Sequence, residues 1–161
     1  MKPFNTEALR RRLPPNTDPA QMAATIRLWL IATAIVGAVL FAIRYTGSYN
    51  QLFYYVEGVR YLRPGQTILP FWSAAGRIAF LGGVQALMAL LLPLQLYGSF
   101  SKSSRSIYLM RRLPDGGRTL RRMVREVPLQ WLAWTAAETL LLLGGAYLIW
   151  RFVTPAACLP I

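Results

Sequence analysis

The sequence contains no histidine, a single cysteine and few acidic side chains. Its 161 residues include 6 acids against 18 lysines and arginines. Because Cys158 is the only thiol, an internal disulfide and a Cys/His zinc site are both excluded. The acids are not paired for acid–base work on one element, and no Ser-x-x-Lys or Gly-x-Ser-x-Gly motif occurs. The sequence therefore argues against an enzyme and predicts no catalytic residue, cofactor or metal.

Long apolar runs dominate what is present. The chain is 55% hydrophobic and only 15% charged. Residues 23–43, 78–98 and 128–150 are each long enough to cross a hydrocarbon core of ~30 Å as a helix, which takes roughly 20 residues. None of them alternates with the period of two that is typical of barrel strands. We therefore expect an all-α integral membrane protein with three transmembrane helices.

Caps and charges set the expected segments and their orientation. Asp18-Pro19-Ala20-Gln21 has the composition of a helix start. Lysines and arginines gather before the first span and between the second and third, which predicts a cytoplasmic N-terminus, a cytoplasmic central loop and an outer C-terminus. The expected parts are a basic cytoplasmic segment 1–18, spans 19–44, 78–100 and 128–151, an outer aromatic interfacial segment 45–77, a cytoplasmic loop 101–127 and an outer tail 152–161.

The outer segment is rich in tyrosine, which suits a membrane interface. Residues 50–62 are expected to form a short helix on the outer surface. The sequence Arg63-Pro64-Gly65-Gln66 then predicts a turn. A re-entrant element within 66–76 is an alternative for the remainder.

The central loop is the most basic part of the chain, and it is expected to be a helical hairpin broken at residues 114–117. In its second half, arginines and apolar residues recur on opposite faces at helical spacing. One interpretation places the apolar face on the bilayer and the arginines on lipid phosphates, at ~1 kcal/mol each. The other is a docking element for a cytosolic partner. The spacing alone favours the lipid interpretation.

Residues 104–122 resemble the first cytoplasmic loop of ABC-2-type transporter permeases. The positions that carry the resemblance are Ser106, Ile107-Tyr108, Leu109-Met110, Leu113-Pro114 and the basic residues from Arg118 onwards. The order of spans also resembles the first half of such a permease, although the family usually has six spans and an acid where this chain has Lys102 and Arg105. The chain is similar, too, to small membrane proteins that accompany bacterial ABC transporters.

The resemblance implies a multi-pass subunit of an export system in a bacterial cell membrane. Its loop would dock on a separate ATPase, because the sequence has no Walker motif, and the partner in the membrane would be a larger permease or a second copy. The expected docking residues are Tyr108, Leu109, Met110 and Leu113 as groove contacts, with Arg111, Arg112, Arg118, Arg121 and Arg122 as charge partners. The alternative function is a non-transporting anchor or assembly factor whose loop binds anionic lipid. Nucleic acid is not an expected partner.

Three polar side chains within the predicted spans, Gln85, Gln95 and Glu138, are candidate sites inside the membrane. Glu138 is near the middle of the third, where a carboxylate costs at least ~2.5 kcal/mol. It could carry protons or contact a substrate, but the favoured interpretation is that it ties its helix to Gln85 or Gln95 of the second span or to a partner subunit. The two glutamines are expected to act as hydrogen-bonding contacts between helices.

Overall fold

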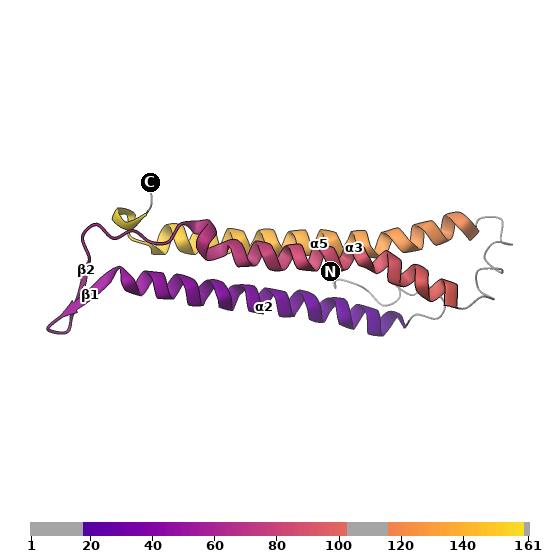
Figure 1. The fold of residues 1–161 in the computed structure, drawn as a ribbon, viewed down its shortest axis with the longest axis horizontal. Helices are drawn as coiled ribbons and strands as arrows, with labels where there is room; N and C mark the ends of the chain where they lie inside the picture. The colour runs from indigo at the N-terminus through magenta and orange to yellow at the C-terminus, as the bar shows by residue number, and fades with distance from the viewer. Residues whose placement is uncertain (1–17, 103–115, 160–161) are drawn as a thin grey trace. The chain divides into compact units, whose positions relative to one another are not determined.

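A computed structural model describes residues 18–102 and 116–159 of the chain. This part contains three long helices, α2 (Pro19–Gln51), α3 (Phe71–Lys102) and α5 (Gly116–Val153), each labelled in Figure 1. All three are long and apolar enough to cross a membrane, over Pro19–Gln51, Phe71–Leu96 and Arg125–Val153. The prediction of three such helices is confirmed.

Large apolar side chains are exposed along all three helices. Phe80 of α3 is 71% exposed, Leu141 of α5 is 77% exposed and Ile43 of α2 is 64% exposed. Apolar exposure on this scale is unusual for a protein in water and is expected for helices that are surrounded by lipid. The exposure pattern therefore agrees with the apolar composition of the helices.

The helices are longer than the apolar runs that predicted them. The α2 helix begins as predicted, with the Asp18 carboxylate accepting a hydrogen bond from the Ala20 amide at 2.9 Å, but it continues to Gln51 instead of ending at 44. The α3 helix starts at Phe71, and α5 continues through Pro128. An apolar run marks the part of a helix that suits hydrocarbon, whereas the helix itself ends where its backbone hydrogen bonds end.

A β-hairpin lies between α2 and α3, so the short helix expected over 50–62 is wrong. Strands β1 (Phe53–Val56) and β2 (Val59–Leu62) pair antiparallel, with Tyr54 opposite Tyr61. The two turn residues between them, Glu57 and Gly58, both have positive φ angles, of 52° and 81°. This is the signature of a type I′ turn, whose twist matches that of the strands.

The two faces of the hairpin differ. On one face Arg60 lies over the ring of Phe53, with its guanidinium carbon 3.6 Å from the ring centroid. On the other face the rings of Tyr54 and Tyr61 stack, with centroids 5.8 Å apart. After β2 the predicted turn is confirmed at Pro64-Gly65, where Gly65 has a φ of 78°. The chain then runs extended to Pro70, where α3 follows in place of a separate re-entrant element.

The chain divides into two compact units. Unit 1 comprises residues 1–32 and 84–136, and unit 2 comprises residues 33–83 and 137–161. The core of unit 1 is built from the first turns of α2, the second half of α3 and the first half of α5. Its buried side chains are Ala23, Ile26, Ala89, Leu92, Leu96, Val127 and Trp131.

The core of unit 2 closes around the segment that follows the hairpin. The Ile68 amide donates to the Cys158 carbonyl oxygen at 2.9 Å, and the Leu69 amide donates to Ser48 Oγ at 3.1 Å. Trp150 Nε1 donates to the Leu69 carbonyl oxygen at 3.0 Å. These bonds satisfy polar backbone groups of an extended segment that has no strand partner, and they fix it over a buried aromatic core.

Candidate functional site

The predicted docking residues fall largely outside the described part of the chain. Tyr108, Leu109, Met110, Arg111, Arg112 and Leu113 lie between residues 102 and 116, which the structure does not describe. Arg118, Arg121 and Arg122 lie on α5, in a stretch where the backbone is helical and the side chains are not described. The expected helix in the second half of the loop is therefore present and is continuous with the third candidate span, while the docking contacts stay predictions.

The carboxyl group within the third span has a partner on α2. Within unit 2, Thr33 Oγ1 donates a hydrogen bond to Glu138 Oε1 at 3.0 Å. The other oxygen, Oε2, is buried and has no hydrogen-bond partner among the described residues. Glu138 is thus bonded to α2 through Thr33, whereas the sequence suggested Gln85 or Gln95 of the second span or a partner subunit. Threonine is common in membrane helices, so its presence alone did not identify the pair.

This pair yields a stability prediction. Thr33→Val removes the donor at nearly constant volume and should lower the free energy of unfolding by ~0.5–1.5 kcal/mol, because a part-buried acceptor loses its partner. Unfolding by sodium dodecyl sulfate in maltoside micelles, followed by circular dichroism, measures the change. Thr46→Val replaces an exposed threonine of the same helix and should have little effect. Equal effects of the two substitutions would contradict the role of the Thr33–Glu138 bond.

Close packing of α3 and α5 in unit 2 depends on one glycine. A Cβ atom at Gly82 would collide with Thr139 Oγ1 and would lie 3.0 Å from its Cγ2 atom. The adjacent Gly83 faces open space, with nothing within 4 Å of a Cβ placed there. The absence of a side chain at Gly82 therefore sets how closely the two helices approach.

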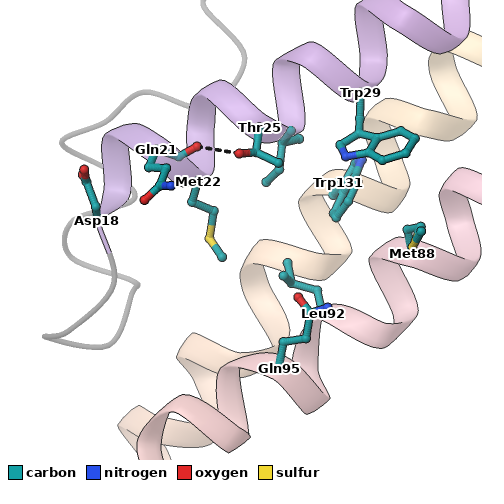
Figure 2. Close-up of a pocket in the computed structure, with 10 residues that line it drawn as sticks. Asp18, Gln21, Met22, Thr25, Trp29, Met88, Leu92, Gln95 and Trp131 are labelled. Carbon is teal, nitrogen blue, oxygen red and sulfur yellow. Dashed lines mark hydrogen bonds between the residues drawn. The ribbon is translucent and has the colours of Figure 1, made fainter.

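Unit 1 contains a groove bordered by α2, α3 and α5, with a volume of about 390 Å³. Figure 2 shows the side chains that line it. They are Asp18, which precedes α2; Gln21, Met22, Thr25, Ile26 and Trp29 of α2; Met88, Leu92 and Gln95 of α3; and Trp131 of α5. The α2 residues recur at three- and four-residue spacing, so they share one face of that helix over roughly 16 Å.

The groove changes in polarity along its length. Asp18 and Gln21 lie towards the left of Figure 2, Gln95 lies below Leu92 at the bottom, and Trp29 and Met88 lie towards the right. Gln95, which was predicted to be an interhelical contact, is exposed and lines this groove. Gln85, in contrast, is only 2% exposed within unit 1, and the hydrogen-bonding roles of both glutamines stay predictions. Chain positions that are separate in sequence meet here, which the linear pattern did not reveal.

The wall of the groove includes a buried hydrogen-bond donor. Trp131 is 5% exposed, and its indole Nε1 has no hydrogen-bond partner among the described residues. A buried donor without an acceptor costs free energy. Asp18 is the only charged side chain among the described residues that line the groove. The groove thus combines one carboxylate, amide and hydroxyl groups, two indole rings and an apolar floor.

Metal chemistry has no visible basis in this part of the chain. Among residues 18–102 and 116–159, no group of three or more histidine, cysteine, aspartate or glutamate side chains could hold a metal ion. Comparison with known proteins gave no match to a family model, to a curated protein or to a solved structure. The class of the protein is therefore inferred from its own residues.

Proposed function

We propose that this chain is a membrane-spanning subunit of an ABC-type export system, similar to ABC-2 permeases, which receives movement from a separate ATPase through its basic segment at 102–127. In this proposal α2, α3 and α5 cross a bacterial cell membrane. The N-terminus and the basic segment face the cytoplasm and the hairpin β1–β2 faces outwards. A larger permease or a second copy of the chain supplies the other spans of the exporter.

The observation that carries the proposal is the continuity of α5. The helix starts at Gly116 and contains the candidate span Arg125–Val153, so Arg118, Arg121 and Arg122 belong to the same helix as the span. The backbone hydrogen bonds of a helix hold successive turns at fixed spacing. A force applied to the arginine-bearing turns by a bound ATPase would therefore be transmitted directly to the helix that enters the bilayer.

The charge and sequence pattern of the same segment support this use. Residues 104–122 resemble the coupling loop of ABC-2 permeases, and arginine side chains suit binding to acidic groups on a partner protein. The anchor function would need the arginines only as lipid contacts, which does not require them to lie on a helix that is continuous with a span. That difference favours the coupling function over the anchor.

The test is charge reversal on the helical part of the segment. The triple substitution Arg118→Glu, Arg121→Glu and Arg122→Glu should lower recovery of the ATPase by at least tenfold, because each like-charge contact opposes docking. Recovery is measured by pull-down from native membranes in mild detergent, with mass spectrometry and photolabelling of bound chains by 8-azido-ATP. The matched triple Arg→Lys variant keeps the positive charge and therefore the expected orientation in the membrane. Recovery of the ATPase with this variant should stay close to the wild-type level.

The result distinguishes the two functions. Unchanged recovery after charge reversal would contradict docking through these arginines. If the wild-type protein brings down no azido-ATP-labelled chain but its loop peptide floats with anionic vesicles, the anchor function replaces the coupling function. Accessibility of an engineered terminal tag in sealed vesicles verifies that each variant keeps the wild-type orientation.

A further inference from the structure

We propose that the groove of unit 1 is a binding site for an amphiphile that carries an ammonium headgroup on an alkyl chain. This inference goes beyond the proposed export function and does not depend on it. It rests on the polarity gradient of the groove, on the charge of Asp18 and on the buried donor of Trp131.

The volume and the floor of the groove fit part of a lipid-like molecule. Binding pockets for small ligands typically span about 300–1,000 Å³, and this one measures about 390 Å³. Its floor contains Ile26, which is 2% exposed, and Leu92, which is 7% exposed. These residues belong to the core of unit 1 and give a fixed apolar surface. An alkyl chain can lie on it and remove apolar area from water.

The charge of the groove selects the headgroup. Asp18 stands at the polar end, where one carboxylate oxygen already accepts the hydrogen bond of the Ala20 amide. The carboxylate gives this end a negative charge, and none of the described residues that line the groove is basic. At the other end Trp29 is 41% exposed, and its indole offers apolar surface to the alkyl chain. The groove therefore favours a cationic head over an anionic one, in a chain whose net charge is +12.

The Trp131 donor adds a requirement for an acceptor on the ligand. Its Nε1 is buried without a hydrogen-bond partner among the described residues, although the residue lines the groove. An ester or phosphate oxygen between the ammonium head and the alkyl chain would satisfy this donor once the indole turns towards the groove. Aminophospholipids such as phosphatidylethanolamine have all three groups. A free alkylammonium compound has the head and the chain but lacks the acceptor.

The experiment places bromine-labelled lipids next to the groove's own tryptophans. Trp72→Phe, Trp134→Phe and Trp150→Phe leave Trp29 and Trp131 as the only fluorescent indoles, because the chain has 5 tryptophans. The full chain is placed in phosphatidylcholine nanodiscs that contain the same fraction of acyl-brominated phosphatidylethanolamine, phosphatidylglycerol or phosphatidylcholine. We expect phosphatidylethanolamine, whose primary ammonium can donate hydrogen bonds to the Asp18 carboxylate, to quench the two indoles roughly two- to fivefold more strongly than phosphatidylcholine, whose quaternary ammonium has no N–H donor.

Asp18→Asn tests the carboxylate without removing the helix cap, since asparagine caps helices as well as aspartate does. In this variant, brominated phosphatidylethanolamine and brominated phosphatidylcholine should quench the two indoles equally. Glu57→Gln removes the same charge from the exposed hairpin turn and should leave the preference intact. Circular dichroism and thermal unfolding verify that the tryptophan-reduced protein and both variants remain folded.

A second arm distinguishes the source of the ammonium group. Dodecylammonium chloride is titrated into discs that contain the brominated phosphatidylethanolamine. Relief of quenching in the wild-type protein, and not in Asp18→Asn, shows that head and chain suffice and that free amphiphiles also bind. Persistent quenching assigns the site to the lipid. Equal quenching by all three headgroups, or an Asp18→Asn variant that behaves like the wild type, overturns the proposal.

Discussion

Gly82→Leu should destabilise unit 2 by roughly 3 kcal/mol, at the upper end of the usual cost of overpacking. Already the first atom of a side chain at this position collides with Thr139, and rotation of the threonine cannot relieve the contact. Its Oγ1 and Cγ2 atoms both face the glycine, and its Cβ lies 3.3 Å from the position of the new Cβ. The α3 and α5 helices would have to move apart, which weakens the packing along their shared contact.

The neighbouring glycine is a matched control. Gly83 is exposed and nothing lies within 4 Å of a Cβ placed there, so Gly83→Leu should leave stability unchanged or slightly raised. Unfolding by sodium dodecyl sulfate in maltoside micelles measures both variants. The pair Gly82→Ala and Thr139→Ala should be more stable than Gly82→Ala alone, because the second substitution removes both atoms in closest contact. Equal stability of the Gly82→Leu and Gly83→Leu variants would show that this contact does not limit helix packing.

Trp150→Ala should release the segment at Ile68 and Leu69 that covers the core of unit 2, and should expose Cys158. The indole of Trp150 is 9% exposed, its ring lies 6.0 Å from the ring of Phe71 between centroids, and its Nε1 bonds the Leu69 carbonyl oxygen. Leu69 follows Ile68, whose amide donates a hydrogen bond to the Cys158 carbonyl oxygen. Truncation of a buried tryptophan costs ~3–5 kcal/mol. Labelling of the thiol should therefore become at least roughly 100-fold faster, at about tenfold per 1.4 kcal/mol.

Maleimide labelling reads this opening directly, because Cys158 is the only thiol in the sequence and is 1% exposed. Trp72→Ala is the control. Trp72 also contacts Phe71, at 5.4 Å between ring centroids, but it is 67% exposed and should change the labelling rate little. Trp150→Phe keeps a ring and loses the donor, so its rate should be intermediate. Equal labelling rates of Cys158 in Trp150→Ala and Trp72→Ala would contradict the role of the Trp150 indole in holding the segment at Ile68 and Leu69 over the core.

The three helices could be predicted because their cause is local. Twenty or so consecutive apolar residues exclude almost every other structure, and the cap at Asp18 marks the start of α2 correctly. The end of α2 could not be read in the same way. Residues 45–51 are polar and aromatic, yet Tyr45 and Ser48 are buried in unit 2, and this packing extends the helix beyond its apolar run.

The hairpin and the groove were missed for different reasons. In residues 53–62 the aromatic and β-branched residues on either side of Glu57-Gly58 are typical of strands, but their apolar character on both faces hides the alternation that identifies a strand. The groove joins Asp18 to Gln95 and Trp131 through the packing of three helices. The spacing of residues in the sequence does not predict which helix faces pack together, nor the orientation of α2 about its axis that brings Thr33 next to Glu138.

The length of α2 has a consequence for where the protein can reside. Its 33 residues correspond to about 50 Å of helix, against about 30 Å for the hydrocarbon core. The excess lies partly in the turns from Tyr45 to Gln51, whose polar and aromatic residues suit the headgroup region. A change in tilt can match bilayers of somewhat different thickness, because the long side chains of Arg27 and Arg44 in the same helix can reach the interface. Hydrophobic mismatch would not confine this protein to membranes of one thickness.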